Sequence, residues 1–203
     1  MQTYRFPLLF CLFLGFIQVG WSQTAQEKAA AEHRNIFLDR SFWKTAPTIE
    51  QVNEKIAEGN DPVELNPFAF DAVTYAILEN TPLTTVKHLL AMEGNEVNKA
   101  THDGRNYLMW AAYKGNTELM QLLVDQGSKT DIVDDHGYNL MTFAAVAGQT
   151  EKEVYDLILE NGGKPNDLNR EGANALLLLS PHLKEERGKS DPIFSAERLE
   201  YTR

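Results

Sequence analysis

The chain has 203 residues, a formal net charge of −10 at pH 7 and a sequence pI near 5.0. This acidity disfavours nucleic acid and anionic lipid as partners, because both are negatively charged, and it favours basic partners. A single cysteine, Cys11, excludes a disulfide within the chain, so packing must stabilise the fold.

Residues 1–22 are predicted to be a secretory signal peptide. Arg5 is the only charged residue of this segment, and an apolar run from Phe6 to Ile17 follows it. The run is shorter than the roughly 20 apolar residues of a membrane-spanning helix, and residues 20–22 place small side chains at both cleavage-site positions. We expect an exported mature chain, periplasmic or extracellular, that does not insert into a membrane. The alternatives are a retained anchor and a lipoprotein with Cys11 lipidated, which the bulky Phe10 before it disfavours.

Residues 23–34 are rich in Ala, Gln, Glu and Lys, a composition typical of a solvated linker. The folded part is expected to begin at Asn35. Apolar residues cluster over residues 36–43 and recur at helical spacing over residues 48–58, so both segments are predicted to be helices. Pro47 separates the two helices, and Gly59 follows the last apolar turn of the second, where a left-handed cap favours glycine.

The following segments repeat this pattern of two helices and a closing glycine. The closing glycines lie 35, 33 and 35 residues apart, and they are Gly59, Gly94, Gly127 and Gly162. A period of about 33 residues indicates a solenoid, whose units bury their apolar faces only against their neighbours. The units are predicted at residues 35–62, 66–98, 101–133 and 134–169, with a partial unit at 170–183.

Inside the units, the expected helices cover residues 68–78, a segment opened by Pro82, residues 108–113 and residues 119–123. Turns are expected at Asp103-Gly104 and at His136-Gly137. An asparagine stands two residues after an equivalent glycine in three units, as Asn106, Asn139 and Asn174. An aromatic residue precedes an alanine in three units, as Tyr75, Trp110 and Phe143, which predicts that neighbouring units stack an aromatic beside a small residue where their helices approach closely.

Residues 35–182 resemble ankyrin repeats. Residues 103–116 of the third unit are similar to the turn, first helix and interhelix glycine of that family, and Leu122-Leu123 with Gly127 are similar to its second helix and cap. The Thr-Pro-Leu-His of the family becomes Asn106 to Met109 here, where Asn can cap the helix as Thr would. The resemblance implies an all-α, helix-turn-helix solenoid with short hairpin loops. It also implies a non-catalytic scaffold without cofactor or metal that binds a protein through a concave groove.

When the contact positions of the family are transferred one by one to this sequence, nine residues of the third and fourth units would line the groove. They are His102, Asp103, Arg105, Tyr113, Lys114, Asp135, His136, Tyr138 and Val146. Tyrosine and arginine are frequent anchors of protein interfaces. The alternative interpretation is that the Asp and His residues serve turns and that the two tyrosines pack on the adjacent unit.

A metal site and a catalytic site are the alternative interpretations of the polar residues of this chain. His102-Asp103 and residues 134–136 occupy equivalent hairpin tips and could face one another. Equivalent backbone atoms of stacked repeats lie roughly 10 Å apart, however, which is too far to share a metal with bonds of about 2.0 to 2.2 Å unless the side chains converge. The mature chain carries no cysteine nucleophile, no His-Glu-x-x-His motif and no Gly-x-Ser-x-Gly motif. Glu185-Glu186 lies in a polar stretch, and neither His88 nor His182 has an orienting partner nearby in sequence. We therefore expect no enzymatic activity.

The C-terminus leaves the array unfinished. A fifth unit begins at Gly172, but no ordinary second helix follows the apolar run Leu176–Leu179. Terminal repeats usually carry a polar outer face. One explanation is a cap formed by the tail, residues 184–203, through Ile193, Phe194, Leu199 and Tyr201; the other is completion of the array by another chain or a longer product. The alternative function is therefore a structural or assembly module that self-associates at its C-terminal end.

Overall fold

A computed structural model describes residues 34–182. In chain order its elements are η1 (Ile36–Leu38), α2 (Arg40–Trp43), α3 (Ile49–Ala57), α4 (Ala72–Leu78), α5 (Leu83–Leu90), η2 (His102–Gly104), α6 (Tyr107–Lys114), α7 (Thr117–Asp125), α8 (Leu140–Val146), α9 (Lys152–Glu160) and α10 (Ala175–Leu179). The predicted signal peptide, nearly all of the linker, and the tail with its four cap residues lie outside the described residues. Within the described range, no helix combines the length and the apolar character needed to span a membrane.

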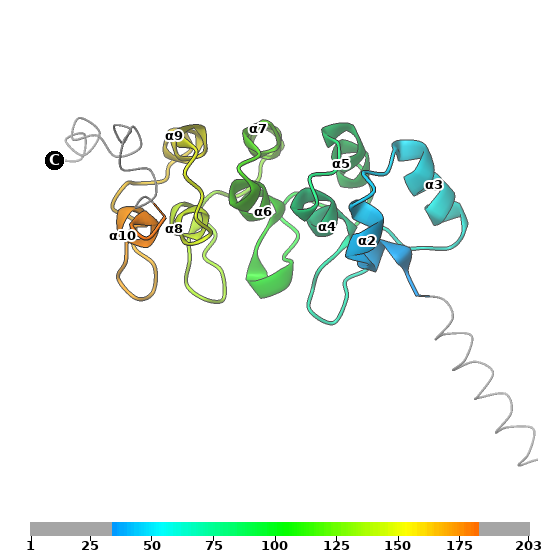
Figure 1. The fold of residues 1–203 in the computed structure, drawn as a ribbon, viewed down its shortest axis with the longest axis horizontal. Helices are drawn as coiled ribbons and strands as arrows, with labels where there is room; N and C mark the ends of the chain where they lie inside the picture. The colour runs from blue at the N-terminus through cyan, green and yellow to red at the C-terminus, as the bar shows by residue number, and fades with distance from the viewer. Residues whose placement is uncertain (1–33, 183–203) are drawn as a thin grey trace, which may run out of the picture. The chain divides into compact units, whose positions relative to one another are not determined.

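The helices from residue 36 onward form two parallel rows (Figure 1). The inner helices α4, α6, α8 and α10 contact one another in that order, while the outer row contains α3, α5, α7 and α9, with contacts between α3 and α5 and between α7 and α9. Hairpin loops precede the inner helices and project beyond them on the side away from the outer row (Figure 1). The predicted all-α helix-turn-helix architecture is confirmed for the described residues.

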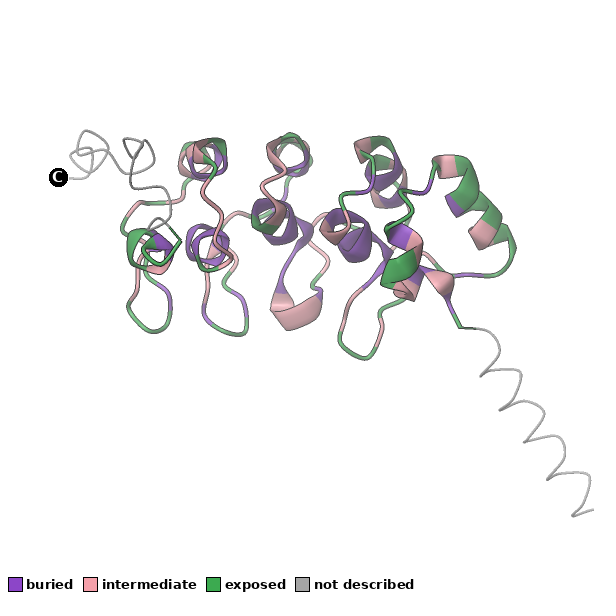
Figure 2. Ribbon diagram, in the orientation of Figure 1, coloured by how far each residue is buried: buried purple, intermediate pink, exposed green. Residues whose placement is uncertain are grey.

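The core lies along the inner row, where α4, α6 and α8 are mostly buried (Figure 2). Small side chains let these helices approach closely, and each of the three contains completely buried alanines: Ala72, Ala76, Ala111, Ala112, Ala144 and Ala145. Larger apolar residues of the outer helices, such as Leu89, Leu119 and Val154, fill the space between the rows. No unit has a separate interior, so each depends on its neighbours for burial.

The recurring asparagines are helix caps, as their register predicts. Asn106 accepts a hydrogen bond from the backbone N–H of Met109 at 3.1 Å, and Asn139 and Asn174 cap α8 and α10 in the same way. In the second unit the carboxylate of Asp71 takes this position and accepts from the N–H of Thr74 at 2.8 Å. A capping side chain contributes about 0.5 to 2 kcal/mol, so this position supports helix formation in four units.

Two predicted helices differ from those observed. The helix expected over residues 68–78 begins only at Ala72, because Asn66 accepts hydrogen bonds from the N–H groups of Phe68 and Phe70 and closes a turn there. Phe68 is consequently 70% exposed. The first predicted helix, residues 36–43, is split into η1 and α2. Asp39 lies between them as the N-cap of α2, and its carboxylate accepts a hydrogen bond from the backbone N–H of Ser41.

A buried polar cluster links the second and third units. The carboxylate of Asp71, which has no exposed surface, lies 3.0 Å from Lys99 Nζ and accepts a hydrogen bond of 2.6 Å from the hydroxyl of Tyr107. Lys99 also donates to the carbonyl oxygen of Val63 at 2.8 Å. Burial, together with the charge of Asp71, raises the pKa of Tyr107 above its ordinary value, so the phenol stays protonated and remains a donor.

Candidate functional site

The face formed by the hairpin loops and the inner helices carries a row of aromatic rings, which we call the ring row. Its members are Phe70, Tyr75, His102, Trp110, Tyr113 and Phe143. Phe70 comes from the hairpin loop before α4 and His102 from η2 at the next hairpin tip, and the other members come from α4, α6 and α8. The row therefore crosses three consecutive units and joins their loops to their helices.

The ring row is in contact throughout its length. The ring centroid of Phe70 lies 4.3 Å from that of His102 and 5.8 Å from that of Trp110, and Trp110 meets Phe143 edge to face at 5.8 Å. Aromatic pairs of this geometry contribute about 0.5 to 1.5 kcal/mol each beyond the area that they bury. Of the three aromatics whose register repeats, Trp110 and Phe143 contact each other across neighbouring units, whereas Tyr75 stacks on Phe70 of its own unit.

Arg105 packs against the Trp110 and Phe143 rings of the ring row and is only 8% exposed. Its Nε and Nη2 atoms lie 2.8 and 2.7 Å from one carboxylate oxygen of Asp134, and Nη1 lies 3.0 Å from Asp103. Its guanidinium carbon sits 4.3 Å from the centroid of the Phe143 ring. The prediction that Arg105 lines the groove as a contact residue is therefore corrected: the guanidinium is committed to interactions inside the array.

The hairpin tips of consecutive units are joined to one another. The N–H of Asp135 donates to the carbonyl oxygen of Asp103 at 2.9 Å, and Nε2 of His136 lies 3.2 Å from the Asp103 carboxylate. His102 contacts the same carboxylate at 3.3 Å through Nε2, while its Nδ1 lies 2.8 Å from the carbonyl oxygen of Phe68. One tip farther along, Arg170 donates to the carbonyl oxygen of Asp135 at 2.9 Å.

The side chains of these two tips converge, since Asp103 lies within hydrogen-bonding distance of His136 from the next tip. Among residues 34–182, no group of three or more His, Cys, Asp or Glu side chains is arranged to hold a metal ion. The geometry instead shows that these polar side chains connect the loops of neighbouring units.

The other predicted contact residues differ in accessibility. Tyr113 and Val146 occupy equivalent positions near the ends of α6 and α8, and they are 41% and 38% exposed. Asp135 and His136 are exposed at a hairpin tip, whereas Lys114 and Tyr138 are half-buried. Tyr138 packs against the hydrophobic core, as the alternative interpretation of the tyrosines holds.

Sequence reasoning missed two aromatics of this face. Phe70 belongs to the ring row, and Phe68 is an exposed aromatic in the hairpin loop of the second unit. Both were assigned to a helix because apolar residues continue from them into α4. Asn66 and Asp71 are the signals that would have placed them in a loop, since Asn and Asp favour turns and N-caps.

Comparison with known proteins gives a family and partial relatives, of which a yeast protein is an example. A family model described as three copies of ankyrin repeats matches residues 73–178, from α4 to α10, which is more than half of the 203 residues. The probable palmitoyltransferase AKR2 of Saccharomyces uvarum is 31% identical over 64 residues. That match covers 32% of this chain and only 9% of the yeast protein. A match this short gives no basis for assigning a transferase activity to this chain.

Proposed function

The chain belongs to the ankyrin-repeat family, and from this premise we propose that it is a non-catalytic scaffold that binds a protein partner. The binding surface is the face formed by the hairpin loops and inner helices of the third and fourth units. We also propose that the mature protein acts in the periplasm or outside the cell. That second proposal rests on the charge and apolar pattern of residues 1–22.

The observation that carries the binding proposal is the exposed edge of the ring row. Tyr113 presents an accessible aromatic side chain, and its ring stacks on Phe143 with the centroids 5.9 Å apart. Val146 adds an exposed aliphatic side chain one unit farther along. An aromatic side chain already held in place loses little conformational entropy on binding, which is how hot-spot residues contribute affinity.

A structural or assembly role is the second candidate, and it is favoured by the last helix of the row. Leu176 and Leu177 of α10 are 39% and 61% exposed, although they belong to an apolar run. Exposed leucines at the end of a repeat array are typical of a surface that another repeat would cover. In this reading the partner is a second copy of the chain.

The test is capture of proteins from an extract of the native compartment on immobilised residues 23–203. The variant Tyr113→Ala/Val146→Ala is expected to lower the yield of a captured partner at least about tenfold, because one hot-spot truncation costs about 2 kcal/mol or more. Quantitative mass spectrometry measures the yield.

The control variant Lys44→Ala/Glu54→Ala changes exposed residues of α3 and the turn before it and should leave the yield unchanged. Equal capture by all three proteins would contradict binding through this face. Recovery of a second copy of the chain as the captured protein would support the assembly role instead.

A further inference from the structure

The last inner helix, α10, exposes two side chains at positions that every preceding unit buries. Leu176 and Leu177 are 39% and 61% exposed. Counted from the capping residue, the equivalent residues of α4, α6 and α8 are Val73 and Thr74, Leu108 and Met109, and Met141 and Thr142, all of them at most 2% exposed. Those three helices are each followed by an outer helix and by another unit, whereas within residues 34–182 no helix follows α10.

The chain leaves α10 along the path that leads to an outer helix in the preceding unit. Gln149 lies directly over Gly115 at the end of α6, since a β-carbon on that glycine would come within 2.4 Å of its Nε2 atom. From Gln149 the chain enters α9. His182 lies over Gly148 in the same way, with its ring 2.9 Å from the position of such a β-carbon. The residues that follow His182 therefore start where the outer helix of a fifth unit is expected.

The tail, residues 184–203, repeats the sequence pattern of α5. Pro82 is the N-cap of α5, and the residues of this helix that pack into the array are Leu83, Thr85, Val86 and Leu89. At the same intervals the tail has Pro192, followed by Ile193, Ser195, Ala196 and Leu199. Side chains at this spacing share one face of a helix. The sequence of residues 192–199 therefore predicts an outer helix similar to α5.

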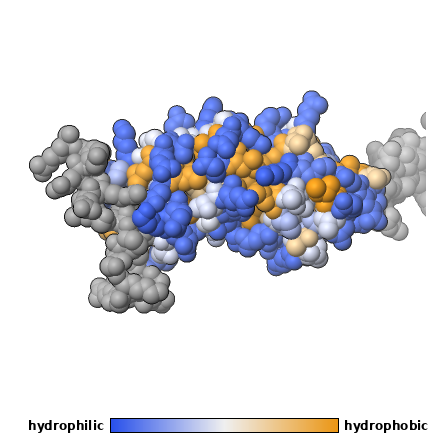
Figure 3. Space-filling view, turned by 90° about the horizontal axis from the view of Figure 1, so that it is seen from above, coloured by the Kyte–Doolittle hydropathy of each residue, from blue (hydrophilic) through white to orange (hydrophobic). Residues whose placement is uncertain are grey.

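The solvent side of this predicted helix departs from α5 at one position. Hydrophilic side chains cover most of the outer row, and smaller patches of hydrophobic surface show between them (Figure 3). In α5 the exposed residues include Thr84 and Lys87, and the tail has Phe194 and Glu197 in their places. Phe194 is thus an apolar residue at a position where we expect exposure, which makes it a control for the inward-facing residues.

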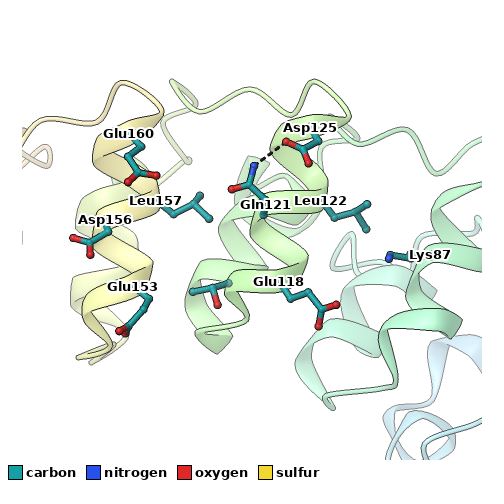
Figure 4. Close-up of a pocket in the computed structure, with 10 residues that line it drawn as sticks. Lys87, Glu118, Gln121, Leu122, Asp125, Glu153, Asp156, Leu157 and Glu160 are labelled. Carbon is teal, nitrogen blue, oxygen red and sulfur yellow. Dashed lines mark hydrogen bonds between the residues drawn. The ribbon is translucent and has the colours of Figure 1, made fainter.

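One position of each outer helix faces the outer helix of the preceding unit. In α7 this residue is Leu122, on the α5 side of the helix, and in α9 it is Leu157, on the α7 side (Figure 4). In α5 it is His88, whose Nε2 lies 2.8 Å from Oδ1 of Asn53 in α3. The equivalent residue of the tail is Arg198. An outer helix formed by the tail would therefore direct an arginine at α9.

The side of α9 that this arginine would meet is acidic. Glu153 and Asp156 lie on the side of α9 that points away from α7 (Figure 4). Asp156 is paired with Lys152 within α9, so the exposed Glu153 is the carboxylate that we expect Arg198 to approach. Opposite charges attract, and this attraction adds to the apolar match between the tail and the end of the array.

We propose that residues 192–199 form the outer helix of the fifth unit and cover the exposed leucines of α10, so that the array is closed by its own tail. The tail is tethered to α10, which gives it a far higher effective concentration at this surface than a second copy of the chain has in dilute solution. Covering the leucines removes apolar surface from water and from contact with other copies. The closure is independent of the ring row, and it takes away the surface on which the assembly role rests.

The experiment measures how fast a thiol at position 177 reacts with iodoacetamide. Residues 23–203 contain no cysteine, so Leu177→Cys supplies the single thiol. Coverage by the tail should make its alkylation at least about tenfold slower than that of Glu54→Cys, an exposed position of α3, because a covered thiol reacts only when the structure opens locally. Adding Ile193→Ser/Leu199→Ser should raise the rate at position 177 nearly to the rate at position 54.

The matched control is Phe194→Ser/Tyr201→Ser, which removes two apolar residues of the tail at positions equivalent to exposed residues of α5. It should leave the alkylation at position 177 slow. Circular dichroism measures whether each variant remains helical. The proposal is overturned by fast alkylation of Leu177→Cys with the tail unchanged, or by equal acceleration in both tail variants. Protection that disappears on dilution would also overturn it, because a second copy of the chain would then be the cover.

Discussion

Replacing Lys99 with methionine is expected to lower the free energy of unfolding by about 3 to 5 kcal/mol, the usual cost of removing one partner of a buried ion pair. Asp71 is completely buried, and Lys99 is its cationic partner at 3.0 Å. The remaining donors, the hydroxyl of Tyr107 and the N–H of Thr74, do not neutralise the carboxylate. Methionine keeps the apolar stem of the side chain, so the loss reports the charge.

Urea denaturation followed by circular dichroism measures this loss. Lys164→Met, which removes an exposed lysine from a loop of the fourth unit, should change the free energy of unfolding by less than about 0.5 kcal/mol. The double variant Lys99→Met/Asp71→Asn should be less destabilised than Lys99→Met alone, because no buried charge is left unpaired. If Lys99→Met unfolded at the same urea concentration as the wild-type chain, the cluster would not stabilise the contact between the second and third units.

Replacing Arg105 with methionine is expected to have an effect of similar size, about 3 to 5 kcal/mol, for a related reason. Asp134 loses both guanidinium contacts while it remains completely buried, and Phe143 loses the cation above its ring. The other carboxylate oxygen of Asp134 still accepts from the N–H groups of His136 and Tyr138, so the hairpin tip keeps part of its anchoring. The loss therefore concerns the junction between the third and fourth units.

Arg105→Lys distinguishes geometry from charge at this position. An ammonium group cannot place two donors on Asp134 and lie flat over Phe143 at once, so lysine should restore less than half of the lost stability. The free energy of unfolding from urea titration is the readout for both variants. Full recovery with lysine would show that a positive charge alone suffices and that the planar contacts contribute nothing.

The row of helix pairs was predictable because its signals are local and repeated. Each closing glycine adopts the left-handed conformation that ends a helix, and each recurring asparagine is an N-cap that begins one. Every unit has the same two requirements, so the same residues recur at the same spacing. The aromatic register of Tyr75, Trp110 and Phe143 also repeats, and it correctly indicated contact between neighbouring units for Trp110 and Phe143. Periodicity thus converts local patterns into an expected architecture.

The polar contacts between units were not predictable in the same way. Arg105 was expected to face a partner, yet it reaches Asp134, which lies 29 residues away and belongs to the next hairpin. Tyr107 stands where the family pattern has proline, and the departure places a hydroxyl group next to Asp71, 36 residues earlier. Each pairing occurs once in the described array, so no repeated sequence pattern predicts it. The partners come together only because the units stack.

The most direct test of the central claim, that the ring-row face binds a protein, is site-specific photo-crosslinking. A benzophenone amino acid would replace Tyr113 in one variant and the exposed Glu54 of α3 in another. On irradiation in an extract of the native compartment, the account predicts a crosslinked protein from position 113 and none from position 54. A crosslink from position 54 alone, or from neither position, would contradict it.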